Sequence, residues 1–286
     1  MARHLDAATR DALAERFRFY RDLGLTEFYR RPVDAAAEAA LTAQEVEPDA
    51  SALAVDEQTP VSIEEQQSAS LMEEQPISAR RTFPAQPPVA AATPAADHAA
   101  ALLAIREEIG DCTRCALHKG RNKLVFADGD PNARLMFVGE GPGADEDAQG
   151  LPFVGRAGQL LNNMIGAMGL DRGQVYICNV VKCRPPGNRT PEPEEANTCS
   201  PFLFQQIDVV RPQVIVALGA TAATYLLGQR QPLAGLRGRV HAFRGMQLIV
   251  TYHPAYLLRD PRQKKEAWAD LQIAMKELGL KPPNRG

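Results

Sequence analysis

The stretch Arg134-Leu-Met-Phe-Val-Gly139 decides the fold, because it is a short apolar run that ends in a loop rich in glycine and proline. Three similar runs follow along the chain, at 175–181, 213–219 and 247–252. Amphipathic stretches typical of helices lie between and after them, at 156–169, 193–210, 220–228 and 263–278. Short, β-branched and almost wholly apolar strands that alternate with helices are typical of a parallel sheet covered on both faces. The sequence therefore predicts an α/β fold with four parallel strands.

Polar residues collect where the predicted strands end. The first strand runs into Glu140-Gly-Pro-Gly143, the second carries Asn179 near its end, and the fourth runs into His253. Right-handed βαβ connections bring such strand ends together at one carboxyl edge, where open α/β sheets bind ligands. The glycine loop lacks the Gly-Lys-Ser/Thr ending of a P-loop and the spacing of a dinucleotide fingerprint. Nucleotide hydrolysis is therefore disfavoured, and a different ligand is expected at this edge.

The five cysteines are an odd number, which argues against a disulfide framework. Cys112 and Cys115 form a CxxC pair, and Cys183 and Cys199 follow across a proline-rich loop. Four thiolates can close around tetrahedral zinc or around an iron-sulfur cluster, and their spacing does not distinguish the two. Unrelated buried thiols and a redox-active pair are the alternatives. Cys178, inside a predicted strand, is interpreted as a core residue.

Charge divides the chain into three parts. Residues 34–97 hold 12 acidic residues against two arginines, with 17 alanines, seven prolines and no glycine. Such a segment buries too little apolar area to offset its chain entropy, so it is predicted to be a disordered linker. Residues 1–33 contain an amphipathic helix pattern that could dock on the main domain or on a protein partner. Residues 98–286 carry 23 basic and 18 acidic residues, a mild excess that is compatible with a polyanion partner.

The chain shows no segment of the roughly 20 apolar residues that a membrane-spanning helix requires. Its N-terminus is charged and amphipathic, which does not resemble a secretory leader. We therefore expect no membrane association and a cytoplasmic, nucleoid-associated location.

Three longer motifs make the reading specific. They are GEGPGADEDAQGLPFVGRAGQLLN at 139–162, NVVKCRPPGNRTPE at 179–192 and HPAYLLR at 253–259. Together with the four cysteines in this order, they closely resemble the family 4, iron-sulfur uracil-DNA glycosylases, over about residues 105–278. The resemblance implies a three-layer α/β/α sandwich with a four-stranded parallel sheet. It also implies a structural [4Fe-4S] cluster on Cys112, Cys115, Cys183 and Cys199.

The resemblance implies a role for each site residue in releasing uracil from DNA. Phe153 would stack on the everted base, Asn179 would read its N3–H and O4, and Glu146 would exclude the C5 methyl of thymine. Substrate contacts are also expected from Glu140, Gly141 and Pro142. His253 would donate a hydrogen bond to O2 as negative charge develops there. Related glycosylases carry a water-positioning aspartate where this chain has Gly141, so Glu140, Glu146 or backbone carbonyls are left to hold the water.

DNA contacts are expected around the last two motifs. Leu257 is predicted as the tip of a wedge that enters the minor groove and replaces the extruded base. Arg259, Arg184 and Arg189, together with Lys182, are predicted to meet phosphates.

The leading hypothesis is a monomeric, monofunctional enzyme that flips uracil out of DNA and hydrolyses its N-glycosidic bond. The abasic site that remains initiates base excision repair. One alternative is a superfamily relative with broader choice of deaminated bases, or one that attaches covalently to the abasic sugar. The latter would need a basic loop with an extra histidine, which 236–241 only faintly resembles. Another alternative is a non-enzymatic nucleic-acid-binding module stabilised by a metal.

Overall fold

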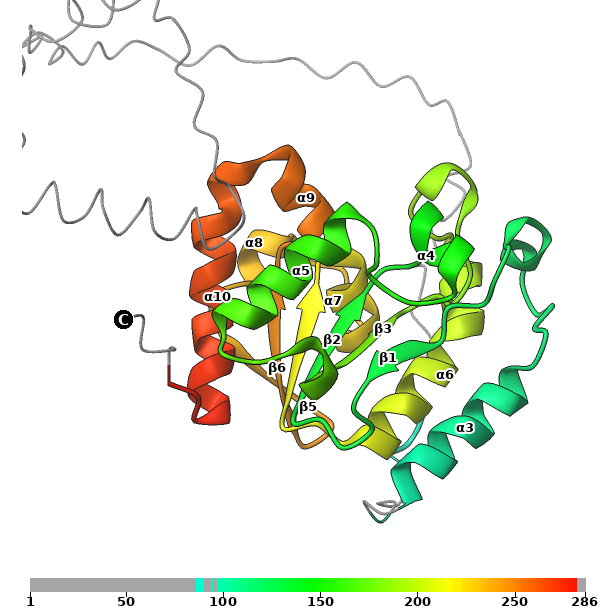
Figure 1. Cartoon of the computed structure of the whole chain (residues 1–286), viewed down its shortest axis with the longest axis horizontal. Helices are drawn as coiled ribbons and strands as arrows, with labels where there is room; N and C mark the ends of the chain where they lie inside the picture. Colours follow the sequence, from blue (N-terminus) through cyan, green and yellow to red (C-terminus); the bar gives the residue numbers. More distant parts are fainter. Residues whose placement is uncertain (1–85, 90–93, 95–96, 282–286) are drawn as a thin grey trace, which may run out of the picture. The chain divides into compact units, whose positions relative to one another are not determined.

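The four predicted strands form the centre of one sheet in a computed structural model, which describes residues 86–89, 94 and 97–281 (Figure 1). They are β2 (Leu135–Gly139), β3 (Tyr176–Asn179), β4 (Val214–Leu218) and β6 (Met246–Thr251). They pair in parallel in the order β3-β2-β4-β6. Among the parallel strands β2 comes first in the sequence, and the sheet extends from it on both sides, to β3 on one side and to β4 and β6 on the other. The strand order therefore reverses at β2. Such a switch point is where open α/β sheets bind ligands.

Two antiparallel edge strands extend this sheet, so the prediction of four strands was too small by two. Strand β1 (Ala127–Gly129) pairs with β3, and β5 (Val240–Phe243) pairs with β6. The turn between β5 and β6 consists of Arg244 and Gly245, with φ of 51° and 81°. Two successive residues at positive φ are typical of the tight hairpin turns that match the twist of paired strands.

Helices cover both faces of the sheet, which confirms the predicted three-layer α/β/α sandwich (Figure 1). On one face pack α3 (His98–Ile109), α6 (Pro193–Val210), α7 (Ala220–Leu227) and α8 (Leu233–Leu236). On the other pack α5 (Arg156–Ala167), α9 (Pro254–Arg259) and α10 (Lys264–Leu278). Side chains of β2 alternate between the two cores, with Met136 and Val138 in the first and Leu135 and Phe137 in the second.

Shorter elements complete the domain. Helix α4 (Ala144–Gln149) follows the glycine loop, and four 3₁₀ turns lie in connections. The turns are η2 (Ala116–Gly120), η3 (Arg172–Gln174), η4 (Pro186–Asn188) and η5 (Pro261–Gln263). None of the helices in the described ranges combines the length and apolarity needed to cross a membrane.

The predicted N-terminal helix within 1–33 and most of the predicted linker at 34–97 lie outside the described residues. Residues 86–89 of that linker are described, and they contact the domain. The Arg244 guanidinium donates to the Pro87 carbonyl at 2.6 Å and to the Pro88 carbonyl at 3.2 Å. Gln86 donates to the Leu226 carbonyl at 2.5 Å. Three of these four residues are thus hydrogen-bonded to the domain, and the disordered linker over 34–97 stays a prediction.

Candidate active site

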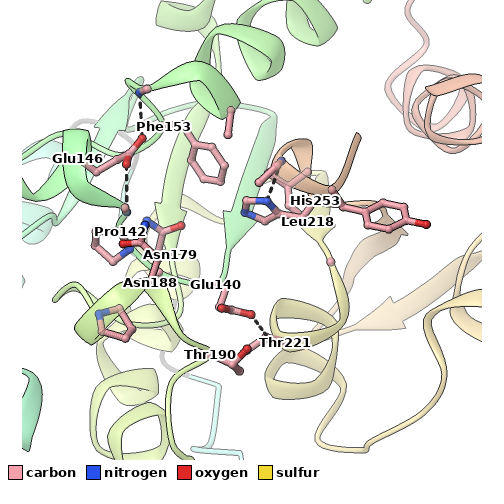
Figure 2. Close-up of a pocket in the computed structure, with 18 of the residues that line it drawn as sticks. Glu140, Pro142, Glu146, Phe153, Asn179, Asn188, Thr190, Leu218, Thr221 and His253 are labelled. Atoms are coloured by element: carbon pink, nitrogen blue, oxygen red, sulfur yellow. Dashed lines mark hydrogen bonds between the residues drawn. The ribbon is translucent and has the colours of Figure 1, made fainter. Parts of the chain in front are cut away.

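A cavity of about 680 Å³ lies at the carboxyl edge of the sheet. All four parallel strands contribute to its lining through the residues at or just beyond their ends. These are Glu140 after β2, Asn179 of β3, Thr221 after β4 and His253 after β6. Phe153 enters from the loop between α4 and α5. In Figure 2 the side chains of Asn179 and His253 lie around one space, as the strand-end argument predicts, and Phe153, which only the resemblance indicated, lies at the same space.

Asn179 and Phe153 form a narrow slot at Gly139. A Cβ atom on Gly139 would lie 2.4 Å from Asn179 Oδ1 and 2.5 Å from Phe153 Cζ, so only glycine leaves both groups in place. Asn179 is 1% exposed, and its Oδ1 has no hydrogen-bond partner within the described part of the chain. A buried unpaired amide oxygen costs about 1–3 kcal/mol. A ligand N–H at this point would recover that free energy.

Phe153 has an unusual backbone for an aromatic residue. Its φ is 52°, in the left-handed region, and its side chain is 5% exposed. Such a conformation in a non-glycine residue costs on the order of 1–3 kcal/mol and persists where the surroundings fix it, often at functional sites. The ring lies 5.6 Å from the His253 ring between centroids, with an interplanar angle of 32°. The slot is therefore bounded by two rings and one amide.

His253 is the residue that precedes α9, and its Nδ1 accepts the backbone N–H of Ala255 at 3.1 Å. Accepting at Nδ1 leaves the proton of a neutral imidazole on Nε2. Burial lowers the pKa of His253 to about 4, with a further lowering by Arg259 and an opposing effect of Glu146. At neutral pH the ring is thus an uncharged donor.

The two candidate carboxylates differ in their surroundings. Glu146 Oε1 accepts the backbone N–H groups of Val154 at 2.9 Å and Gly155 at 3.1 Å, and its Oε2 accepts that of Gly143 at 3.0 Å. This carboxylate therefore links the glycine loop to residues 150–155 between α4 and α5, which we call the Phe153 loop (Figure 2). Glu140 Oε2 instead accepts the Thr221 hydroxyl at 2.5 Å.

Gly141 and Pro142 of the glycine loop lie at the cavity next to Glu140. A Cβ on Gly141 would lie 2.7 Å from Val181 Cγ2, so the structure has no room here for an aspartate side chain. Pro142 is buried and lines the cavity.

Leu257 is not the tip of a wedge. It is 1% exposed and packs in the core shared by α5 and α10. The reason is that α9 begins directly after His253, which turns Leu257 inward and leaves Leu258, 36% exposed, on the outside. Arg259 is exposed and lines the cavity.

The other predicted phosphate contacts have protein partners. Arg189 donates to both oxygens of Glu195, at 2.8 and 2.7 Å, and also lines the cavity. The hydrogen bonds from Arg189 lower the pKa of Glu195. Arg184 donates to Asn188 Oδ1 at 2.7 Å. Lys182 is buried, which contradicts the prediction that it meets phosphate: its Nζ donates to the Asn179 carbonyl at 2.8 Å and to Gln206 Oε1 at 2.5 Å.

The four predicted metal ligands, Cys112, Cys115, Cys183 and Cys199, line a second, small apolar cavity. Three N–H donors contact their sulfur atoms at 3.3 Å: Arg114 to Cys112, Arg121 to Cys183, and the Lys182 backbone to Cys199. Burial raises the pKa of Cys199 to about 11. Within the described ranges, no group of three or more Cys, His, Asp or Glu side chains is close enough to hold a single metal ion. Cys178 is fully buried in β3, which confirms its interpretation as core.

Sequence reasoning missed Thr221 and the arginine that contacts the Phe153 loop, Arg172. Thr221 could have been found, since it follows the third predicted strand at the same carboxyl edge. Arg172 carried no such signal, because its contacts at Pro152 and Phe153 lie about 20 positions away.

Comparison with known proteins shows the class to which this α/β/α sandwich and its strand-end cavity belong. The Uracil DNA glycosylase superfamily model matches residues 126–272. The type-4 uracil-DNA glycosylase of Thermotoga maritima is 49% identical over 158 residues, 54% of this chain and 82% of the relative. Those of Pyrobaculum aerophilum and Sulfurisphaera tokodaii are 46% and 43% identical, over 59% and 62% of this chain and 90% and 84% of the relatives.

The chain belongs to the uracil-DNA glycosylase superfamily, and within it to the type-4 uracil-DNA glycosylases.

Proposed function

We propose that this protein hydrolyses the N-glycosidic bond of uracil in DNA and leaves an abasic site, the first step of base excision repair. Glycosylases must evert the base, which costs a few kcal/mol and least for a poorly paired base such as uracil opposite guanine. The observation that carries the proposal is the unpaired Asn179 Oδ1, buried beside the Phe153 ring and across from His253.

Uracil is recognised through its Watson–Crick edge. Asn179 Oδ1 accepts N3–H, and its NH₂ group donates to O4. Cytosine presents an acceptor at N3 and a donor at C4, so it would face like groups as long as the Asn179 amide keeps this orientation. Stacking on Phe153 contributes about 1–3 kcal/mol without selecting among bases. The three backbone hydrogen bonds of Glu146 hold its side chain in place, which supports its role in excluding the C5 methyl of thymine.

Bond cleavage places negative charge on uracil and positive charge on the sugar. The Nε2–H of neutral His253 donates to O2 as this charge develops, and it is already oriented by the hydrogen bond at Nδ1. Glu146 is occupied by backbone donors, so we assign the water-holding carboxylate to Glu140, which Thr221 orients. The N1–C1′ bond breaks with its electron pair on uracil, and that water then attacks C1′ of the oxocarbenium-like sugar and gives its proton to the Glu140 carboxylate.

DNA is held around the mouth of the cavity. Leu258 is the exposed apolar side chain of α9, and we assign to it the wedge that fills the space of the everted base. Arg259 beside it contacts phosphate, with Arg184 and Arg189 as further phosphate contacts.

We also infer that Cys112, Cys115, Cys183 and Cys199 hold a [4Fe-4S] cluster. Four thiols line one cavity and three of the sulfurs receive N–H donors, which suits thiolate ligands of a cluster. A zinc ion would use the same four thiolates, so the metal content of the purified protein decides between the two. The cluster would be structural, joining the segment after α3 to the loop after β3 and to α6.

The test is cleavage of a uracil-containing oligonucleotide after alkali treatment. We expect excision to fall by at least about 100-fold for Asn179→Ala or His253→Ala. Asn132→Ala, at an exposed position before the opposite end of β2, should excise normally. Binding to uracil-containing DNA without base release by the natural chain would instead support a binding module, and release of other deaminated bases would support the broader specificity.

The cluster is tested separately by iron and sulfide content and by absorption near about 400 nm, which Cys183→Ala should abolish. We also propose that the protein is a monomer, and the purified chain should elute as one in size-exclusion chromatography. We further propose that residues 1–33 bind a protein partner, which a pull-down with this segment tests.

A further inference from the structure

The Phe153 loop is held from two sides by groups outside it. On its N–H side, Glu146 accepts from Val154 and Gly155. On its carbonyl side, Arg172 donates from Nη2 to the Pro152 carbonyl at 2.6 Å and from Nη1 to the Phe153 carbonyl at 3.1 Å. The backbone at Phe153, which has the left-handed conformation, is therefore held between the Glu146 carboxylate and the Arg172 guanidinium.

Arg172 is itself fixed by two side chains. Its Nε donates to Asp128 Oδ2 at 2.7 Å, and its Nη1 also donates to Asn162 Oδ1 at 2.9 Å. Asp128 belongs to the edge strand β1 and Asn162 to α5. The planar guanidinium thus joins β1 and α5 to the loop in one geometry, which a lysine ammonium could not reproduce.

The Phe153 carbonyl has little freedom to move. A Cβ on Gly158, in the first turn of α5, would lie 1.9 Å from this oxygen. The carbonyl is thereby packed against the helix backbone while Arg172 binds it. Because φ of Phe153 sets where the ring points, holding this peptide also sets the ring against the slot.

We propose that Arg172, held by Asp128, is a positioning residue of this glycosylase: it fixes the Pro152–Phe153 backbone so that the Phe153 ring is preset to stack on the everted base. This inference rests on the proposed stacking role of Phe153. Arg172 itself does not line the cavity and acts through Phe153 alone.

The experiment is a double-mutant cycle with Arg172→Gln and Phe153→Ala, measured as kcat/KM for uracil excision from an oligonucleotide. We expect Arg172→Gln to lower kcat/KM by about 10- to 100-fold, since misplacement by about 1 Å costs up to about 100-fold. In a Phe153→Ala background the same change should cost less than about 3-fold, because there is no ring left to position. Full additivity of the two losses would overturn the proposal.

Two further variants separate positioning from general stability. Arg134→Gln is the matched control, since Arg134 also bridges distant parts, donating to Gln213 Oε1 at 2.8 Å and to the Leu278 carbonyl at 2.7 Å, away from the site. It should leave kcat/KM within about 2-fold. If Arg172→Gln does not fold, Asp128→Asn loosens the same guanidinium, and its cycle with Phe153→Ala gives the same readout.

Failure of this proposal is distinct from failure of the proposed function. If Phe153→Ala and Asn179→Ala both excise uracil normally, the slot is not the base site. If those variants lose activity and Arg172→Gln does not, the slot stands and the positioning role is wrong.

Discussion

Gly139→Ala tests the slot most directly, because one methyl group reaches both of its walls. The added Cβ would lie 2.4 Å from Asn179 Oδ1 and 2.5 Å from Phe153 Cζ. Favourable contact begins near about 3.5 Å, so each group must retreat by about 1 Å. Gly139 is a strand residue without positive φ, so the backbone itself tolerates alanine. The change therefore acts through the side chains of the slot.

We expect uracil excision by Gly139→Ala to fall by about 100-fold, since about 1 Å of misplacement has an effect of that size. Overpacking should lower the free energy of unfolding by about 1–3 kcal/mol. Single-turnover cleavage of a uracil oligonucleotide measures the first, and urea unfolding measures the second. The matched control is Gly166→Ala in α5, where a Cβ meets nothing within 4 Å and excision should be unchanged. A folded Gly139→Ala protein that excises uracil at the natural rate would refute the position of the slot.

Four further predictions follow from burial and charge. His253 stays neutral until pH about 4, so excision should lose no His253-dependent activity between pH 7 and 5, whereas an acid limb near 6.5 that vanishes in His253→Gln would contradict this. Because the unfolded chain protonates His253 first, its contribution to stability should decline as pH falls from about 6.5 towards 4, as measured by urea unfolding. Leu257→Ala should lower the free energy of unfolding by about 2–5 kcal/mol. Leu258→Ala should change that free energy by no more than about 0.5 kcal/mol and should instead slow excision from duplex DNA. The reverse pattern would restore Leu257 as the wedge. Lys182→Met should lower the free energy of unfolding by about 1–3 kcal/mol for each carbonyl oxygen that it leaves unpaired. Equal urea midpoints for this variant and for the exposed control Lys265→Met would disprove the stabilising role of Lys182.

The centre of the fold could be predicted because its strands carry their own signal. Each parallel strand is a continuous apolar run between helical stretches, and the observed bounds differ from the predicted ones by two residues at most. The edge strands carry no such signal. Ala127-Asp-Gly129 has almost no apolar side chain, and Val240–Phe243 is largely exposed. Their structure comes from pairing with β3 and β6, which a local pattern does not encode.

The site divides in the same way. Asn179 and His253 could be placed together because strand ends meet at one edge. The predicted DNA contacts of Leu257 and Lys182 were wrong because the direction of a side chain depends on packing. Helix α9 places the Leu257 side chain in the core, and the Lys182 ammonium is hydrogen-bonded to Gln206 of α6 inside the protein. Arg172 reaches the Phe153 loop from a distant turn, and such contacts arise only once the chain has folded.

The four parallel strands bring side chains to the cavity at or just beyond their ends, and the connections that follow these strands are separate stretches of chain. A rigid sheet keeps these connections independent, so one of them can be exchanged while the other three keep their positions. The groups proposed to select the base lie on β3 and on the segment after β2, whereas the proposed donor to O2 lies after β6. Engineering a new base specificity would therefore mean rebuilding the segment after β2 or the end of β3 while leaving the histidine after β6 untouched.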